Sequence, residues 1–239
     1  MKNKTKYIDV YHFLKSKILS MQLMPGESIN INNLVTYLGI SRSPVRDALL
    51  KLEKEELVTS SPKVGTRVSK INISRSLEER FIRACIETKV IEEFIQVYTA
   101  ADMERLVSLQ AQLKVAIEQR QLREAFALDN SFHQVFFDTT QHMLSFQTLQ
   151  EQSNHYTRFR LLGLTELSLM DKVCSDHDAL IALIQAKNTI EAQRTLESHI
   201  TPDNTKRILR QRYSDLFDHV DAQQATAENI FERDFLLDL

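Results

Sequence analysis

The sequence has no tryptophan, and its 239 residues include only four glycines, four prolines and two cysteines. So few glycines and prolines cannot supply the many tight turns of a β-sandwich or barrel, so we expect a mainly helical fold. Two cysteines, Cys85 and Cys174, exclude a disulfide framework. No apolar run approaches the ~20 residues that span a bilayer, and the N-terminus lacks the apolar stretch of a signal peptide. We therefore expect a cytoplasmic protein with no membrane partner.

Charge is unevenly distributed along a chain that is long enough for two domains. Residues 1–72 contain 12 of the 30 Lys and Arg residues but only 6 of the 32 Asp and Glu residues, a net charge of +6. The remainder carries a net charge of −8. A small basic module joined to a larger acidic one is typical of a nucleic-acid-binding head on a separate body. The alternative is chance asymmetry.

The first seventy residues have the pattern of three short helices followed by a β-hairpin. Apolar residues at helical spacing predict a first helix that ends before a Pro-Gly turn signal. Asn30 can cap a second helix that Gly39 ends, and Ser41 can cap a third. Residues 57–59 and 66–68 then indicate two short strands. This order predicts a winged helix-turn-helix over residues 1–72.

The third helix of this unit carries the side chains best suited to DNA. The second helix of a helix-turn-helix lies in the major groove with its first residues nearest the bases. Arg42 and Arg46 lie in those first turns, and an arginine fork can pair with guanine or hold phosphate. Lys63 and Gly65 lie at the expected wing tip, where they can approach the DNA backbone. The alternative is that these arginines are solvated surface charges.

The segment 24–68 resembles the N-terminal domain of GntR-type bacterial regulators. The matching pieces are Pro25-Gly26, Leu34, Leu38-Gly39, the run from Ser41 to Leu49, Leu52-Glu53, Leu57-Val58 and Gly65. The resemblance implies that the recognition helix meets DNA through Arg42, Ser43 and Arg46, and that Gly65 lies at the tip of the wing.

The sequence departs from this family pattern at two positions. The family usually has glycine just before the leucine that matches Leu57, and this chain has Glu56. Some relatives carry a DNA-contacting arginine in the second helix, where this chain has Asn32. We therefore do not count Asn32 among the expected DNA contacts, and the predicted fold is unchanged.

From residue 74 onward helical periodicity dominates, which predicts an all-α antiparallel bundle over residues 73–220. The expected helices are 74–99, 102–119, 121–139, 142–162, 165–186 and 188–217. The first of them is expected to bury Leu77, Phe81, Ala84, Ile91 and Phe94 or Ile95. Residues 221–239 form a tail that could add a helix packed on the body or on a partner subunit.

Four polar residues of the body have the spacing of a metal site. Asp129 and His133 are one helical turn apart, so both side chains leave one face of a helix. His177 and His199 follow at intervals of 44 and 22 residues, on two other expected helices. One carboxylate and three imidazoles suit Zn, Ni, Mn or Co. Cys174 could add a soft ligand; the alternative for any single histidine is a satisfied or exposed side chain.

The body also resembles the FadR C-terminal (FCD) branch of the GntR family. Arg83 and Glu87 match its Arg-x-x-x-Glu pattern, and Asp129 and His133 match its Asp-x-x-x-His pattern. The resemblance implies one divalent ion per chain, zinc foremost, at the floor of a pocket for a small organic acid.

A carboxylate effector needs cationic partners in such a pocket. Arg83, on the first body helix, is the main candidate for the carboxylate clamp. Arg158 and Arg160 are further candidates, although only one of them can face inward from a helix. His142 is a fourth, since it lies where the family often has asparagine.

Three functional hypotheses follow from these patterns. The first is a homodimeric transcription regulator that binds a two-fold-symmetric double-stranded operator and responds to a small carboxylate on a metal. The second is a metal-responsive regulator with no organic effector. The third is a metal-dependent hydrolase, since three histidines and an aspartate can activate water. The sequence contains neither an HExxH helix nor a Gly-rich phosphate loop, so we expect no enzyme.

Overall fold

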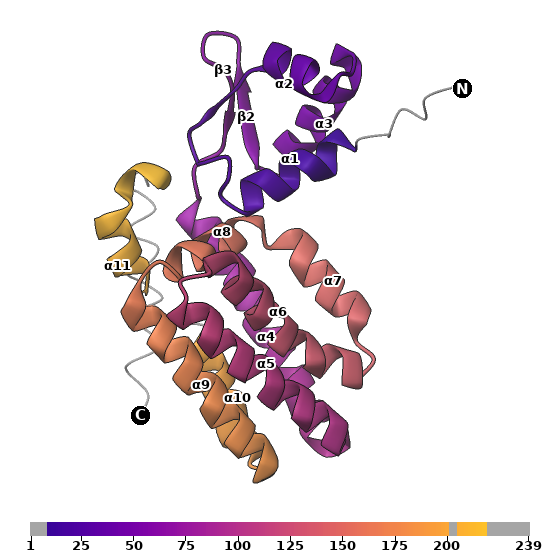
Figure 1. The fold of residues 1–239 in the computed structure, drawn as a ribbon, viewed down its shortest axis with the longest axis vertical. Coiled ribbons are helices and arrows are strands. Elements are labelled where there is room, and N and C mark those ends of the chain that lie inside the picture. Colours follow the sequence, from indigo (N-terminus) through magenta and orange to yellow (C-terminus); the bar gives the residue numbers. More distant parts are fainter. Residues whose placement is uncertain (1–8, 201–204, 219–239) are drawn as a thin grey trace.

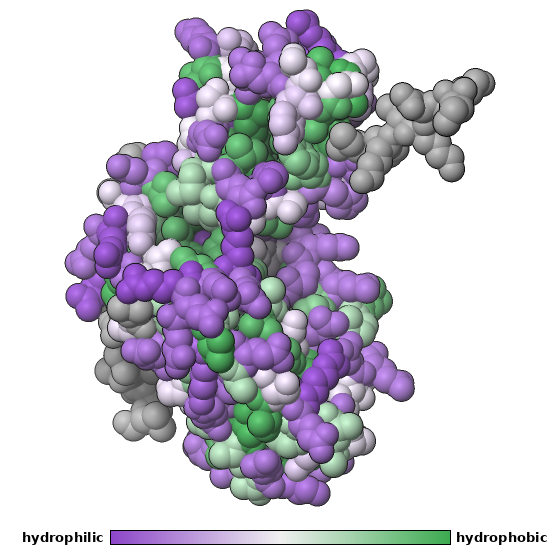
Figure 2. Space-filling model, viewed as in Figure 1, coloured by the Kyte–Doolittle hydropathy of each residue, from purple (hydrophilic) through white to green (hydrophobic). Residues whose placement is uncertain are grey.

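The computed structural model describes residues 9–200 and 205–218, which form a small head above a larger helical body (Figure 1). The tail expected at 221–239 lies outside the described residues. On the face shown in Figure 2, hydrophilic side chains predominate, and green side chains form small separate groups on both lobes. No described helix is both long and apolar enough to cross a bilayer.

The head is a winged helix-turn-helix, as the sequence predicts. Its elements are α1 (Val10–Leu19), β1 (Ser28–Ile29), α2 (Ile31–Leu38), α3 (Arg42–Lys54), β2 (Val58–Ser61) and β3 (Gly65–Val68). The Asn30 side chain accepts from the first backbone N–H groups of α2, and Gly39 ends that helix with a φ of 66°. Buried apolar side chains of the three helices and the sheet form one core, which includes Leu14, Val45 and Leu52.

The wing contains one strand more than the sequence predicts. The sheet order is β1-β3-β2 and all pairs are antiparallel, with Ser28 opposite Arg67 and Ser61 opposite Gly65. Glu56 adopts a φ of 58°, a left-handed conformation that a residue without Cβ adopts at no cost. This explains why the family places glycine there, and Glu56 carries the strain in this chain.

The body is a bundle of antiparallel helices. Its elements are α4 (Ile73–Val97), α5 (Ala100–Glu118), α6 (Leu122–Thr139), α7 (Met143–Gln152), α8 (Asn154–Gly163), α9 (Leu167–Gln185), α10 (Thr189–Ile200), α11 (Thr205–Arg212) and the 3₁₀ turn η1 (Ser214–Leu216). α10 packs between α4 and α9, and α5 packs along α6 and α9. The helix expected at 142–162 is divided at Ser153, whose ψ of 44° is not helical. The helix expected at 188–217 ends at Ile200, before a separate α11.

The inward face of α4 combines charged residues with the predicted apolar ones, of which Ala84, Ile91, Phe94 and Ile95 are buried. Phe81 is 63% exposed, so the prediction that it is buried is wrong. Glu79, Arg83 and Glu87 are buried instead, on the face toward α6 and α8. Burying charged groups is costly unless they are paired, so these buried charges indicate a polar binding site inside the bundle.

The segment that joins head to body forms hydrogen bonds with the body at several of its residues. The carbonyl of Ser69 accepts from the Arg158 guanidinium (2.7 Å), and the N–H of Asn72 donates to Nδ1 of His155 (3.0 Å). Between them, Ile71 forms an isolated parallel bridge with the chain after η1. The junction is therefore fixed on the body and, through α8, connected to the interior of the bundle.

Candidate metal centre, pocket and DNA interface

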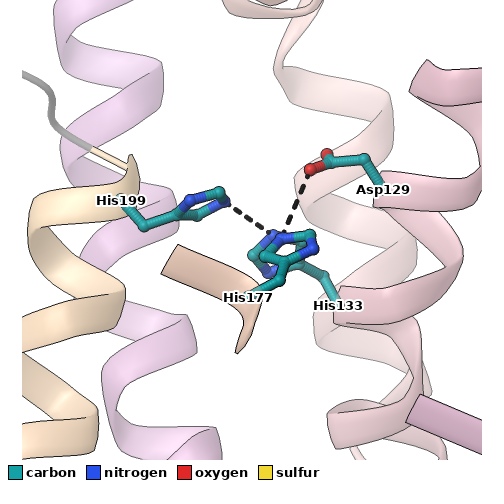
Figure 3. Close-up of side chains that lie close together, drawn as sticks. All are labelled: Asp129, His133, His177 and His199. Carbon is teal, nitrogen blue, oxygen red and sulfur yellow. Dashed lines mark hydrogen bonds and ion pairs between the residues drawn. The ribbon is translucent and has the colours of Figure 1, made fainter. Parts of the chain in front are cut away.

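The four residues of the predicted metal site converge inside the bundle (Figure 3). Asp129 and His133 come from α6, His177 from α9 and His199 from α10. One ligand atom from each residue lies within 4.8 Å of those of the others. Nε2 of His133 and Nε2 of His199 are 3.2 Å apart, and Nε2 of His177 lies 3.5 Å from Oδ1 of Asp129.

The outer nitrogen of each imidazole faces an oxygen from outside the cluster. The Nδ1 contacts are His133 to Glu87 Oε2 at 2.6 Å, His177 to Gln110 Oε1 at 3.2 Å and His199 to Asp176 Oδ2 at 3.3 Å. The Gln110 amide is oriented by its own nitrogen, which donates to the carbonyl of Cys174 and to Asp178. Ionised carboxylates and amide oxygens only accept hydrogen bonds. These acceptors favour a proton on each Nδ1, which would leave the Nε2 lone pairs for a metal; the His133 and His199 Nε2 atoms, 3.2 Å apart, would then be two facing lone pairs that a cation between them relieves.

Burial and charge keep the ligands in the forms that a metal needs. Burial would raise the pKa of Asp129, but the Arg160 guanidinium and the imidazoles hold it far below its usual range. Burial lowers the pKa of His133 and lowers that of His177 further. At neutral pH the centre therefore presents an ionised carboxylate and at least two neutral imidazoles.

These donors fit a borderline divalent ion. Nε2 of His177 is buried and has no hydrogen-bond partner, and it faces an acceptor-only carboxylate oxygen. Lone pairs that face each other in a dry site repel, and a cation between them removes that cost. Zn²⁺ and similar divalent transition-metal ions favour a set of three imidazoles and one carboxylate. In such sites oxygen acceptors commonly hold the outer nitrogen of each imidazole.

A pocket opens beside the cluster and is lined by Arg83 from α4 and Arg160 from α8. The Arg160 guanidinium forms an ion pair with Asp129 and donates to Asn130 (3.0 Å). It also lies over the Phe126 ring, 4.7 Å from the centroid. Burial and the neighbouring Arg83 lower the pKa of Arg160, which reflects two guanidinium groups sharing one enclosed space. Such a space attracts anions.

The remaining pocket wall is mostly apolar. It includes Phe126, Tyr156, Phe159, Leu164, Leu169, Val173 and Ile200. Thr205, at the start of α11, also lines this pocket, and its buried hydroxyl has no hydrogen-bond partner among the residues that the structure describes. The pocket thus combines cationic groups, the carboxylates of Asp129 and Asp176, an apolar wall and the Thr205 hydroxyl.

Two of the predicted effector residues lie elsewhere. Arg158 does not line the pocket; its guanidinium is fully buried against Ser69, and this burial lowers its pKa to about 10. His142 bonds Glu93 (2.8 Å) on the surface, with 43% of its side chain exposed. The predictions that these two contact an effector are therefore corrected. Arg158 and Arg160 are two residues apart on α8, so the helix directs them to different sides.

Three functional candidates were missed by the sequence patterns: Glu87, Gln110 and Asp176. Glu87 ends the Arg-x-x-x-Glu pattern and Asp176 precedes His177, so both had a signal that could have been used. Gln110 had none, because its role depends on α5 packing against α9. Cys174 is outside the ligand group found among the described residues, and burial raises the pKa of its thiol.

The expected DNA residues lie together on one face of the head. Arg42, Arg46 and Gly65 border a shallow groove between α3 and the wing. Ser43 is exposed in the first turn of α3, and Lys63 is exposed in the turn between β2 and β3. Asn32, which stands where some relatives have a DNA-contacting arginine and was not counted among the expected contacts, borders the same groove.

Comparison with known proteins identifies both parts of the chain. The family model described as "Bacterial regulatory proteins, gntR family" matches residues 6–68, and the FCD domain model matches residues 80–202. The chain belongs to the GntR family, in its FCD branch. It is a DNA-binding transcription regulator with an effector-binding helical domain, and the relatives it matches are regulators rather than enzymes.

Several relatives match over nearly the whole chain. The transcriptional repressor RspR of Escherichia coli is 26% identical over 209 residues, which is 87% of this chain and 92% of that protein. The regulator YdhC of Bacillus subtilis is 28% identical over 202 residues, which is 82% of this chain and 88% of that protein. The structure of E. coli McbR/YncC has a TM-score of 0.68 at 20% identity and covers 89% of this chain and 100% of that one, so it supports the fold alone.

Proposed function

We propose that the helical body of this regulator binds one divalent metal ion and a small organic acid, and that the acid modulates operator binding by the head. The observation that carries the proposal is the three-histidine cluster, whose Nδ1 atoms all face oxygen acceptors, beside Arg83 and Arg160. We assign the DNA-binding function to residues 1–72 and the metal and effector function to residues 73–220.

Asp129, His133, His177 and His199 would hold the ion, and zinc is the first candidate. Zinc accepts three imidazoles and one carboxylate in tetrahedral geometry and expands to a fifth ligand readily. Ni, Mn and Co are the other candidates, since supply as well as geometry selects the metal. When bound, the ion would supply a Lewis-acidic position for one carboxylate of the effector.

The charges of the site favour an anionic effector. Arg83 is paired with Glu87, and Arg160 with Asp129. A bound divalent ion adds two positive charges that no further carboxylate of the cluster neutralises. A small acid held by the ion, Arg83 and Arg160 would supply this negative charge. The Thr205 hydroxyl would form a hydrogen bond with a further polar group of that acid, either as donor or as acceptor.

The proposed DNA contacts are Arg42, Ser43 and Arg46 in the major groove, and Lys63 and Gly65 along the backbone. We propose that the regulator binds as a homodimer, because one small head offers limited contact and a two-fold operator pairs two of them. Exposed apolar side chains of α4 and α10 would meet at the subunit contact. These are Phe81, Ile82 and Ile190, which are 63%, 49% and 63% exposed.

The experiment begins with the metals and small molecules carried by purified protein, identified by mass spectrometry. An operator selected from random duplex DNA is then titrated with metal-free and metal-loaded protein, with and without a panel of hydroxy and sugar acids. The proposal predicts that an acid changes DNA affinity only in the metal-loaded protein, and that Arg83→Ala blunts this response. A change produced by metal alone would favour a metal-responsive regulator. If neither metal nor acid changed DNA affinity, the effector role would be refuted.

A further inference from the structure

Glu87 contacts both Arg83, the proposed clamp for the acid, and His133, a residue of the proposed metal site. It lies on the inward face of α4 and is 1% exposed. Its Oε1 accepts from Nε of Arg83 (2.5 Å), and its Oε2 lies 2.6 Å from Nδ1 of His133. A carboxylate at this depth needs a partner for each oxygen: Oε1 has the Arg83 bond, and Oε2 has the close His133 contact, although that contact lacks the alignment of a hydrogen bond in this structure.

Each of these contacts leaves available the nitrogen atoms of Arg83 and His133 that are proposed to bind the acid and the metal. Arg83 uses Nε, the nitrogen nearest its stem, so its two terminal nitrogens remain for the pocket that this residue lines. His133 uses Nδ1, so its Nε2 remains for the metal centre. Glu87 is absent from the wall of this pocket and lines only a small neighbouring cavity with Arg83 and Arg160, so it lies behind both groups and is placed to orient them.

We propose that Glu87 is a positioning residue that holds His133 in its metal-binding tautomer and couples metal binding at His133 to the order of the Arg83 clamp. This inference rests on the proposed function of the site. An acceptor-only oxygen on Nδ1 keeps the ring proton away from the metal and raises the basicity of Nε2. A metal on Nε2 would polarise the ring and strengthen the contact between Nδ1 and Glu87 Oε2. The carboxylate would then be fixed, and its other oxygen would hold Arg83 in place.

The neighbouring histidine offers a matched control. Gln110 supports His177 in the way that Glu87 supports His133, since its Oε1 lies 3.2 Å from Nδ1 of that ring. Gln110 has no contact with Arg83 and does not line the pocket. Gln110→Met should therefore weaken metal binding without affecting the clamp, whereas Glu87→Gln should affect both.

The experiment uses Zn²⁺ alone as the probe on the full chain. Competition with a chromophoric chelator gives the zinc Kd, and NMR follows exchange of the Arg83 Nε proton with water. We expect Glu87→Gln and Gln110→Met each to lose about 10–100-fold in zinc affinity. Zinc should slow exchange of the Arg83 Nε proton in the parent and in Gln110→Met, but not in Glu87→Gln.

A measurement on the parent keeps the test independent of how the variants fold. Nitrogen-15 NMR of the metal-free parent should show His133 protonated at Nδ1, and protonation at Nε2 would overturn the proposal. Zinc affinity in Glu87→Gln equal to that of the parent, or an unchanged response of the Arg83 proton, would also overturn it and leave the proposed function standing. A parent that bound no zinc would instead refute the metal centre and this proposal with it.

Discussion

Removing the metal should lower the melting temperature of the body, and the expected size follows from the ligand set. The four candidate ligands come from α6, α9 and α10, so a bound ion would join α6 to the later helices α9 and α10. An ion that binds only the folded state stabilises it by about 4 kcal/mol when its free concentration is about 1,000 times the Kd. For a protein of this size, roughly 2–4 °C per kcal/mol gives a shift of about 8–16 °C.

The His177→Ala variant should lose this shift, but the substitution should also change the melting temperature of the metal-free protein. His177 stacks on Phe132 with centroids 3.9 Å apart, so the substitution also opens a cavity, at a cost of about 2–4 kcal/mol. It removes a buried nitrogen without a partner as well, which offsets part of that cost. The informative quantity is therefore the difference between melting temperatures with zinc and with chelator, which should fall to near zero.

Differential scanning fluorimetry measures the shift, and elemental mass spectrometry counts ions per chain. The parent should carry about one ion, and His177→Ala should lose most of it. His142→Ala is the matched control, because His142 is a partly exposed histidine paired with Glu93 outside the cluster. Equal metal content in the parent and in the His133→Ala, His177→Ala and His199→Ala variants would refute the site.

Three further predictions concern DNA binding, the junction and acid stability. Arg46→Ala should lose about 1–3 kcal/mol in operator binding, or roughly 5–150-fold in Kd, without a change in melting temperature; an unchanged Kd would contradict the recognition helix. Arg158→Met should shift the melting temperature by only a few degrees, because the lost bond to the Ser69 carbonyl is offset by removal of a buried charge. Hydrogen exchange at residues 69–72 should accelerate, and unchanged exchange would contradict this role. Burial lowers the pKa of His155 to about 3, so below pH 6.5 only the unfolded chain takes up this proton, and stability should fall by about 2 kcal/mol between pH 7 and 5. Urea titrations across this range should show a shallower loss in His155→Gln, and parallel slopes would contradict the assignment.

Local chemistry made the head predictable from the sequence. Asn30 and Gly39 mark the ends of α2 through a side-chain cap and a left-handed φ, both of which depend on residue type alone. The two-residue strand β1 was missed because nothing local distinguishes Ser28 and Ile29 from a loop. Its existence depends on pairing with β3, which is a contact across nearly forty residues.

In the body, the convergence of Asp129 and the three histidines was predictable from the sequence, but the positions of the arginines were not. The one-turn spacing of Asp129 and His133 fixes a shared helix face, whatever the rest of the fold does. Arg158 and Arg160 differ only in which side of α8 they occupy, and the helix register depends on the break at Ser153. Phe81 was assigned to the core on hydrophobicity, but Glu79, Arg83 and Glu87 occupy that part of the inward face of α4. A polar site inside a bundle inverts the usual pattern over the residues that serve it, while Ile91, Phe94 and Ile95 of the same helix are buried as predicted.

That inversion also bears on how an effector could act on the head. α8 carries Tyr156 and Arg160 into the pocket, while its Arg158 bonds the carbonyl of Ser69 at the junction. α4 carries Arg83 into the same pocket and begins at Ile73, directly after that junction. A ligand changes a protein only through interactions that differ between two arrangements. An acid that drew Arg83 and Arg160 together would move α4 and α8 relative to each other, and both helices hold the segment on which the head is mounted. Arg158→Met should therefore weaken the connection between the pocket and the junction through α8 and leave the connection through α4 unchanged. A partial change of DNA affinity with the acid in this variant would indicate that both helices contribute.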